Sequence, residues 1–224
     1  MREILELKLM YTKKLELYKR TLHLIPRQRE ILIGKLLGDG HLETQNNGRT
    51  FRLKIEHAIT QRPYVDWLAS EFSGWLRTPP RVWTRTVNGK AYRKYGFQTV
   101  SHPAFRFYAQ QFYRLGRKVV PSQIHRWLTP LVFTVWYMDD GSVKSLQTNG
   151  RILNTQGFMK DDVERLVTTL NQRYTVSAIS RKQPEGWQIF IPGGSAEKLN
   201  ALLIPLLLPL FKYKLPNHKG NTRA

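Results

Sequence analysis

The sequence predicts an α+β fold made of two copies of one unit. Two apolar helical runs, LIGKLLGDG at 32–40 and FTVWYMDDG at 133–141, both end in Asp-Gly, and 101 positions separate their acidic residues Asp39 and Asp140. Strand-like segments with alternating polar and apolar residues follow each run, and helical segments lie between them. Because self-similarity at a fixed offset indicates a repeated structural unit, we expect a duplicated α+β domain.

Two further pairs of residues recur in the same order at nearly the same offset. Gln61 and Gln156 each follow a threonine and lie 95 positions apart, while Lys118 and Lys214 each precede a proline and lie 96 positions apart. Three matching pairs support one duplication more strongly than any single pair does. The predicted organisation is an N-terminal helical extension at 1–21, a first half at 22–121 and a second half at 122–224.

Each half contains the same coarse series of elements. Pro26 and Pro130 lie where the two apolar helices begin, and proline suits the first helical turn. The turns VNGK at 87–90 and QPEG at 183–186 are typical of β-hairpins. The predicted strands lie at 49–58, 81–87, 92–100, 150–156, 174–182 and 186–192. The other predicted helices lie at 64–76, 102–114, 161–174 and 195–207.

The charge of the chain points to a polyanionic partner. Lys and Arg number 36 against 16 Asp and Glu, which gives a formal net charge of +20. The basic residues are spread along the chain and interleaved with aromatic residues, as in RVWTRTVNGKAYRKYGFQ, whereas a disordered basic tail forms blocks that are poor in aromatics. Nucleic acid is therefore the first candidate partner.

The composition leaves several classes of protein unsupported. The chain has no cysteine, which rules out disulfides and thiolate metal sites and fits a reducing compartment. Its six histidines show no ligand spacing and no Gly-rich loop ends in Lys-Ser/Thr, so neither a zinc nuclease nor an ATP-driven motor is supported. The charged N-terminal segment fits neither a signal peptide nor a membrane span, and Pro205 and Pro209 interrupt the most apolar stretch.

The acidic residues at the ends of the two apolar helices indicate a cation-binding site. A carboxylate at a helix C-terminus meets the negative end of the helix dipole, and a glycine directly after it is the usual helix stop. If the two helices pack side by side, Asp39 and Asp140 come together, and a divalent ion shared with phosphate oxygens relieves their repulsion. Gly34 and Gly38, one helical turn apart, would permit close approach of the second helix.

The two runs resemble the paired motifs of single-chain LAGLIDADG homing endonucleases, and the similarity extends over nearly the whole chain. NTQGF after the second motif and the Lys-Leu-Pro near the C-terminus look like the mitochondrial, intron-encoded branch. The last acidic residue of the family motif falls on Asp39 and on Asp140. Asp139 holds the preceding position as a helper or cap, and Lys35 departs from the consensus at a position that varies in the family.

The resemblance implies both a fold and a site. The fold is a saddle of antiparallel sheets formed by two pseudo-symmetric αββαββα-type units, with the motif helices at the centre, set over double-stranded DNA. The activity is Mg²⁺-dependent cleavage of both strands across the minor groove by a monomer, leaving short 3′ extensions, with Mn²⁺ or Ca²⁺ as substitutes in binding. The expected catalytic residues are Asp39, Asp140, Lys118, Lys214, Gln61 and Gln156, with both glutamines on strands. The expected metal ligands are Asp39, Asp140, Gly38 and Asp139.

DNA recognition is expected from the polar faces of the strands. In TFRLKIEH, the residues Arg52, Lys54 and Glu56 alternate with apolar ones, and successive side chains of a strand point to opposite faces. Arg reads guanine and Gln reads adenine at major-groove edges, while most such contacts reach phosphates. The candidate DNA-binding residues are Arg52, Lys54, Arg81, Arg85, Arg93, Lys94, Lys144, Arg181, Lys182, Gln183 and Gln188.

Two alternative functions share the same scaffold. One is an intron maturase that binds RNA to help splicing, and the other is a DNA-binding regulator that does not cut. Two carboxylates beside phosphates add nothing to a pure binding module, so they favour cleavage, whereas maturase activity can coexist with an intact cleavage site. The expected location is a mitochondrion or chloroplast, or else a bacterial or archaeal cytoplasm.

Overall fold

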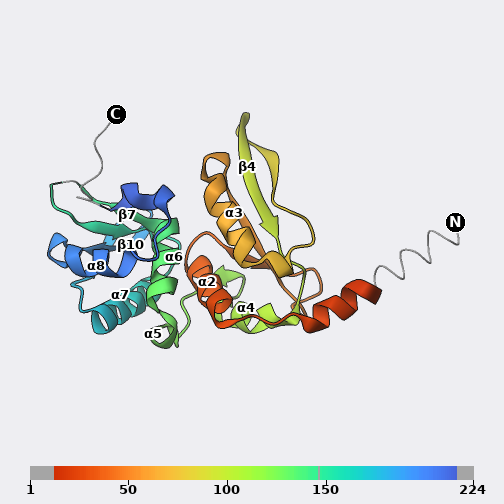
Figure 1. Ribbon diagram of the computed structural model, residues 1–224. Coiled ribbons are helices and arrows are strands. Elements are labelled where there is room, and N and C mark those ends of the chain that lie inside the picture. The colour runs from red at the N-terminus through yellow and green to blue at the C-terminus, as the bar shows by residue number, and fades with distance from the viewer. Residues whose placement is uncertain (1–12, 146, 216–224) are drawn as a thin grey trace, which may run out of the picture.

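Two α+β halves flank a central pair of helices, α2 (Pro26–Leu37) and α6 (Pro130–Asp140), in the computed structural model, which describes residues 13–145 and 147–215 (Figure 1). Each half contributes a four-stranded antiparallel sheet, in the orders β1-β2-β4-β3 and β7-β8-β10-β9. The two orders match strand for strand. The predicted α+β fold, built from two similar units around a helix pair, is therefore confirmed.

The first half carries the longer strands, and a helix at 13–21 packs against it, where the Tyr18 hydroxyl donates a 2.6 Å hydrogen bond to the Gly74 carbonyl. The remaining residues of the predicted N-terminal helical extension lie outside the described part of the chain. The strands of this half are β1 (His41–Glu43), β2 (Arg52–Ala58), β3 (Arg81–Val87), β4 (Lys90–Gln98), β5 (Tyr113–Arg114) and β6 (Arg117–Lys118). Its other helices are α3 (Arg62–Glu71) and α4 (Arg106–Phe112), with 3-10 turns at Ile59–Gln61, Ser73–Trp75 and Pro103–Phe105.

The second half follows a short connecting helix, α5 (Ile124–Trp127). Among the described residues, no helix combines the length and the hydrophobicity needed to cross a membrane. The strands of this half are β7 (Gly141–Val143), β8 (Arg151–Leu153), β9 (Ile179–Gln183) and β10 (Gly186–Ile191). Its other helices are α7 (Lys160–Tyr174) and α8 (Ala196–Leu203), with 3-10 turns at Gly193–Ser195 and Pro209–Lys214.

The C-terminal part of α2 and nearly all of α6 are buried on every side, which explains why these stretches are almost entirely apolar. Every residue from 31 to 37 of α2 and from 131 to 138 of α6 is buried. The close approach predicted from the glycines is confirmed, because a Cβ added to Gly34 would lie 2.7 Å from the Cβ of Val135, and one added to Gly38 would lie 2.6 Å from the Cβ of Asp139. Glycine on α2 thus allows the backbones of the two helices to meet.

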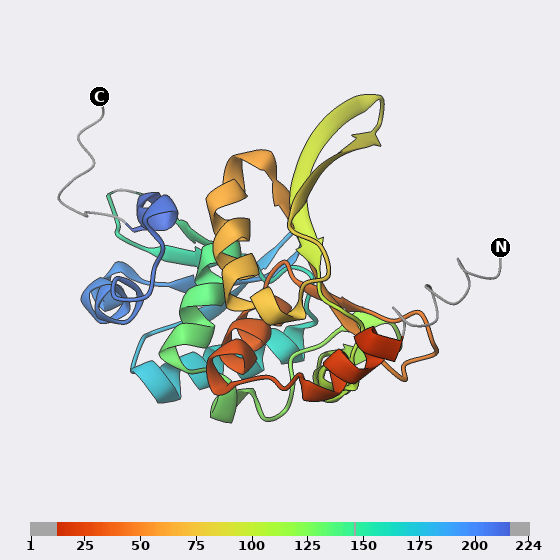
Figure 2. The ribbon, with the colours of Figure 1, turned by 45° about the vertical axis from the view of Figure 1, so that its right-hand side comes forward.

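The strands of the first sheet follow the predicted alternation. Along β2, Leu53, Ile55 and His57 are buried, while the residues between them are half-buried on the other face. The turn at Asn88-Gly89 joins β3 to β4 with φ of 50° and 75°, the left-handed backbone that a tight hairpin turn requires. Figure 2 shows that this hairpin extends well beyond the helices.

One predicted strand, 174–182, is wrong over its first part. Helix α7 continues to Tyr174, and Thr175 then takes a left-handed conformation with φ of 51°. The side chain of Asn171 accepts a hydrogen bond from the Ala178 N–H and donates one to its carbonyl, at 2.7 and 2.9 Å. These bonds close a compact connection, so the β-branched residues at 175 and 176 lie before the strand and not in it.

Candidate active site

The two candidate catalytic carboxylates lie at the adjoining ends of the central helices. Asp140 is the last residue of α6, whereas Asp39 follows the end of α2 by two residues. Both lie close enough to Asp139 for its charge to raise their pKa values. The helix pair therefore brings one acidic residue from each half to a common site.

Asp140 is held in place by its own helix. The indole N–H of Trp136, one turn earlier, donates a 3.1 Å hydrogen bond to Asp140 Oδ2. The backbone carbonyl of Asp140 accepts two further bonds from Asn154. Burial, followed by the charges of Asp139 and Asp39, raises the pKa of Asp140 to about 7. A carboxyl group with that pKa is stabilised in its charged form by any added cation.

Asp39 has a different environment. Its side chain is 53% exposed, and Oδ2 lies 3.8 Å from Nδ1 of His57. Its pKa is also raised, by partial burial and by the charge of Asp139, while Lys35, Lys118 and Lys214 oppose the shift. The backbone N–H of Asp39 donates a hydrogen bond to Asp139 Oδ2 at 2.9 Å.

At each helix end, a lysine from another element reaches the terminal carbonyls: Lys118 from β6 and Lys214 from the 3-10 turn Pro209–Lys214. Lys118 Nζ donates to the Gly38 carbonyl at 2.5 Å, and Lys214 Nζ donates to the Met138 and Asp139 carbonyls at 2.6 and 3.0 Å. Cations are favoured at helix C-termini. Burial lowers the pKa of Lys118 to about 8 against the opposing effect of the nearby carboxylates, and burial likewise lowers the pKa of Lys214.

Asp139 is engaged by an internal ion pair. Lys35 Nζ lies 2.7 Å from both of its carboxylate oxygens, and neither side chain is exposed to solvent. The Tyr64 hydroxyl donates to Asp139 Oδ1 at 2.9 Å. Asp39, His57 and Asp139 offer ligand atoms within 4.8 Å of one another, but Lys35 already pairs with Asp139. Asp139 is thus a buried partner of α2, and its predicted role as a metal ligand stays a prediction.

The two glutamines are not on strands, so that expectation is wrong. Gln61 ends the 3-10 turn that follows β2, and Gln156 lies in the turn after β8. Gln61 is close enough to hydrogen-bond the ring of His57. Each sheet strand stops before its glutamine because the chain must turn there into the next helix.

The donor set at the helix ends fits a hard divalent cation. Mg²⁺ prefers oxygen ligands and is usually bound by one or two carboxylates. The carboxylate of Asp39 is half-exposed, and burial together with the neighbouring carboxylates raises the pKa of both Asp39 and Asp140, an effect that a bound cation would oppose. The Gly38 carbonyl already accepts from Lys118 but retains a second lone pair.

The polar face of the first sheet carries internal ion pairs. Glu43 on β1 lies 3.0 Å from Arg52 and 3.0 Å from Lys54, both predicted DNA-binding residues. Burial alone would raise the pKa of Glu43, but hydrogen bonds from Lys54, His41 and Arg52 outweigh it and lower the pKa to about 2. A phosphate must therefore compete with this carboxylate for both cations.

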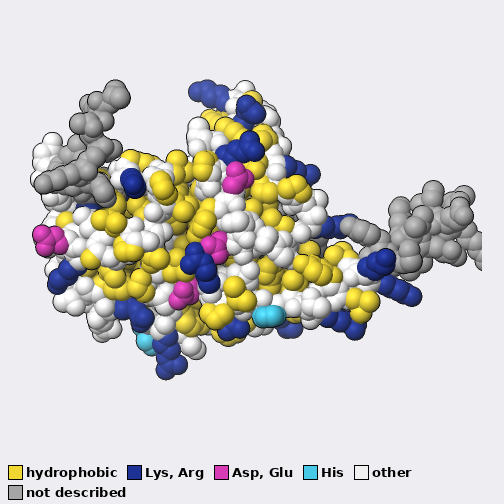
Figure 3. All heavy atoms as spheres, viewed as in Figure 1, with side chains coloured by type: hydrophobic (Ala, Val, Ile, Leu, Met, Phe, Trp, Pro, Cys, Tyr) yellow, Lys and Arg dark blue, Asp and Glu magenta, His cyan; other side chains and the backbone are white. Residues whose placement is uncertain are grey.

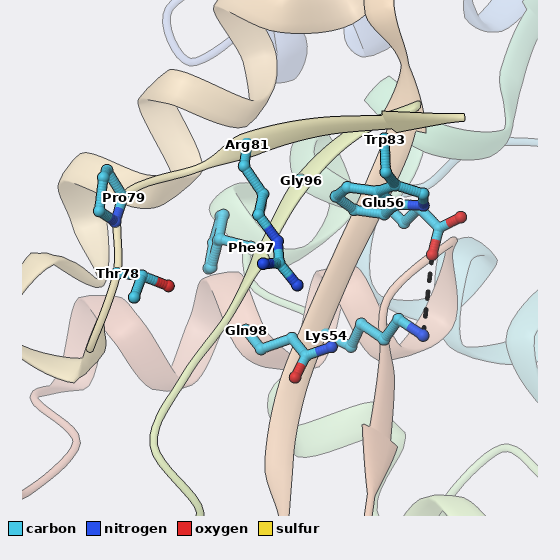
Figure 4. Close-up of a pocket in the computed structure, with 9 residues that line it drawn as sticks. All are labelled: Lys54, Glu56, Thr78, Pro79, Arg81, Trp83, Gly96, Phe97 and Gln98. Atoms are coloured by element: carbon cyan, nitrogen blue, oxygen red, sulfur yellow. Dashed lines mark ion pairs between the residues drawn. The ribbon is translucent and has the colours of Figure 1, made fainter. Parts of the chain in front are cut away.

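A pocket opens on the same face, between β2, β3 and β4 (Figure 4). Lys54, Arg81 and Gln98 contribute polar groups to it. Trp83 lies over Gly96, and this ring and the Ile55 carbonyl together leave no room there for a side chain. The pocket thus combines cationic and amide groups with one flat aromatic wall, which suits nucleic acid. Glu56 also lines it and lies 3.8 Å from Lys54, so its carboxylate partly offsets the positive charge there.

The remaining predicted DNA-binding residues lie on or near the two hairpins. Figure 3 shows Lys and Arg side chains gathered toward the end of the β3–β4 hairpin. Arg181 lies 3.4 Å from the ring centroid of Phe190, and Lys144 lies 5.0 Å from it. Gln188 donates to Asn154 at 3.2 Å. The exposed members of the set are Arg81, Arg85, Arg93, Lys144 and Lys182, and the half-buried ones are Arg52, Lys54, Lys94, Arg181, Gln183 and Gln188.

Sequence reasoning missed several residues that build the site. Lys35, His57, Tyr64 and Trp136 all contact a candidate catalytic aspartate or its neighbour Asp139. One signal was available, since a lysine within an otherwise apolar helical run must find a buried anion. His57 and Tyr64 gave no such signal.

The comparisons with known proteins agree with this geometry. Residues 29–199 match the family model described as the LAGLIDADG DNA endonuclease family. The chain belongs to this family. The family's two-motif architecture accounts for the paired helices and for the two similar sheets.

Individual relatives cover nearly the whole chain. "DNA endonuclease I-ChuI" of Chlamydomonas applanata is 28% identical, over 88% of this chain and 99% of its own. "Cytochrome b mRNA maturase bI2" of Debaryomyces hansenii is 28% identical, over 84% and 73%. The solved structure of the homing endonuclease I-WcaI bound to its DNA recognition sequence superimposes with a TM-score of 0.85 at 26% identity, covering 90% of this chain and 91% of that one.

Proposed function

We propose that the protein is a metal-dependent, site-specific endonuclease that cuts both strands of a long, asymmetric double-stranded DNA target. By the family resemblance, it hydrolyses one phosphodiester bond per strand across the minor groove, acts as a monomer and leaves short 3′ extensions. The proposed target is DNA, which the DNA-bound relative and the net charge of +20 both favour.

One observation carries the proposal. Two carboxylates, Asp39 and Asp140, come from corresponding positions of the two halves and lie together at the ends of the central helices, where the pKa of each is raised. In a protein that only binds DNA, negative charge beside the phosphates would weaken binding. Retaining both carboxylates in a strongly basic chain is explained by a cation that they hold for catalysis.

The proposed mechanism assigns each half one set of groups. A divalent cation, when bound, supplies Lewis acidity to the attacking water and to the leaving oxygen. Asp39 and Asp140 would hold it, while Lys118 and Lys214 would neutralise charge that develops on the phosphate. The lowered pKa of Lys118, about 8, leaves that amine able to exchange a proton near neutral pH. Gln61 and Gln156 lie in turns from which their amides orient solvent.

The test is to replace each aspartate by asparagine and to measure cutting and binding separately. We expect Asp39→Asn and Asp140→Asn to abolish double-strand cutting with Mg²⁺ while both variants still shift the target in a gel. Full cutting by either variant would overturn the assignment. Because the target is unknown, selection of cleaved sites from a randomised DNA library comes first and tests activity at the same time.

A second function is favoured by the maturase relative. Intron RNA is then an additional partner, and splicing assistance does not require cutting. In a splicing assay with the host intron, Asp39→Asn and Asp140→Asn would retain full activity if both functions coexist. A loss of splicing in step with the loss of cutting would argue against a separate RNA function.

A further inference from the structure

The two motif helices end differently. In α6 the helical pattern continues through Asp140, and the Gly141 N–H bonds the Tyr137 carbonyl. In α2 the pattern stops earlier, and the Gly40 N–H bonds the Lys35 carbonyl at 2.8 Å. The intervening backbone N–H, that of Asp39, donates to the carboxylate of Asp139 on the other helix.

That carboxylate belongs to a four-residue network at the helix interface, which we call the Lys35 network. Its members are Lys35, His57, Tyr64 and Asp139. Lys35 Nζ contacts Asp139 at 2.7 Å and His57 Nε2 at 3.0 Å, and all four side chains are buried or nearly so. The second half has Trp136 at the position that matches Lys35 in the repeat, and its indole bonds Asp140 directly.

The proton positions in the network follow from the donors available. An ammonium group has only donors, so Nε2 of His57 must accept from Lys35. The proton of the neutral ring is then on Nδ1, the atom that lies 3.8 Å from Asp39 Oδ2. The network therefore holds Asp39 by one hydrogen bond, from its backbone N–H to Asp139, and the His57 ring, too far from the Asp39 carboxylate to bond it, supports this arrangement through Lys35.

We propose that Asp139, Lys35 and His57 are positioning residues for Asp39, so that Asp139 serves the catalytic carboxylate of the opposite half and not Asp140 beside it in the sequence. Trp136 is the corresponding positioning residue for Asp140. The two halves thus orient their aspartates by unrelated devices. This inference rests on the proposed endonuclease function, because it concerns the order and rate of cutting of the two strands.

The experiment measures the two strands separately. The substrate is a duplex carrying a library-selected site, with a different fluorophore on each 5′ end, and single-turnover rates are read for each strand with Mg²⁺. The full chain is compared with Trp136→Phe, which keeps an aromatic ring at this buried position but removes the indole N–H and the second ring. Two double variants, Lys35→Met/Asp139→Leu and Lys35→Met/Asp139→Asn, remove the buried ion pair together, and only the asparagine keeps an oxygen to accept the Asp39 N–H.

We expect opposite strand preferences. Loss of one orienting hydrogen bond should slow the affected strand about 5- to 10-fold. Trp136→Phe should slow one strand, the leucine double variant should slow the other, and the asparagine double variant should return the ratio of strand rates toward that of the wild type. Circular dichroism verifies that the variants are folded.

Several results would overturn the inference. Slowing of the same strand by Trp136→Phe and by the leucine double variant would do so, as would equal slowing of both strands or no difference between leucine and asparagine. In each case the wild type still cuts, so the proposed function stands. A wild type that cuts neither strand of any selected site would overturn the proposed function and this inference with it.

Discussion

The central helices of the two halves are related by the repeat but carry complementary residues where they meet. Gly34 on α2 meets Val135 on α6, and Gly38 meets Asp139. Lys35 on α2 supplies the positive charge that Asp139 requires. The strand orders of the halves are the same, yet their interface is made of unlike surfaces.

This difference shows where each half has been free to change. Sheet topology must persist for the fold to form, whereas the helix interface needs only that the two sides match each other. Small residues and a lysine on one side fit larger residues and an acid on the other. The comparison between halves is therefore best tested at paired positions.

The largest expected effect comes from leaving Asp139 without its cation. Lys35→Met should lower the free energy of unfolding by ~3–5 kcal/mol, because it leaves the buried carboxylate of Asp139 without a cation. Urea unfolding checks this, with Lys90→Met, an exposed lysine on β4, as the matched control. Adding Asp139→Leu should restore most of the stability. A cost below about 1 kcal/mol for the single variant, the size of an exposed pair, would contradict the buried pairing.

The next effect tests the close approach of the helices. Gly34→Ala should cost about 1–3 kcal/mol, since overpacking a tight interface displaces the backbone. The same substitution at Gly194, where a Cβ meets nothing within 4 Å, should be nearly neutral. Equal melting temperatures for the two variants would show that the helix interface tolerates a methyl group.

A smaller effect should separate the two hairpins in DNA binding. The β3–β4 hairpin of the first half is longer than β9–β10 of the second, so it should neutralise more phosphates. Arg85→Ala/Arg93→Ala should reduce the slope of log affinity against log salt by about 0.9 for each phosphate that is no longer neutralised. Lys182→Ala should reduce this slope by no more than about 0.9, the contribution of one phosphate.

The control for this comparison is Arg106→Ala on α4, an exposed arginine away from both sheets. Its salt dependence should equal that of the wild type. If Arg106→Ala changed the slope as much as the hairpin variant does, the DNA would not be lying on the sheets.

The last comparison concerns the pH dependence of stability. The folded pKa of Asp140, about 7, exceeds its usual unfolded value, so the folded state binds the extra proton. The stability that this group contributes is therefore present at low pH and is lost as the pH rises through about 7. Without metal, the melting temperature of the wild type should fall relative to that of Asp140→Asn between pH 5 and about 8.

Mg²⁺ should remove this difference by stabilising the carboxylate, and it should stabilise the wild type more at about pH 8 than at about pH 5. Thermal unfolding with and without the ion provides the measurement. A shift that is the same at both pH values, or one that persists in Asp140→Asn, would show that the ion binds elsewhere.

The fold could be predicted from the sequence because its signals are local or periodic. The offset between Asp39 and Asp140 indicated the duplication, and the alternation around Lys54 indicated the buried face of β2. The hairpin turn at Asn88-Gly89 was predicted by residues that favour a positive φ. Each of these inferences needed only a few neighbouring residues or one repeat.

The supporting network of the site could not be predicted in the same way. Lys35 and Asp139 are 104 positions apart, and His57 joins them from β2, a strand that follows α2 in the chain. Pairing of Glu43 with the basic residues of β2 depends on strand register. The turns that hold Gln61 and Gln156 were missed because the alternation typical of a strand continues in the sequence beyond the last residue that pairs with a neighbouring strand.

The complementary helix interface has a consequence for how the two halves can pair. A dimer of two first halves would bury two copies of Lys35 with no acid between them and would oppose glycine to glycine across a gap. A dimer of two second halves would force valine against valine and one aspartate against another at positions that now fit only glycine. Neither half is therefore expected to form this interface with a second copy of itself.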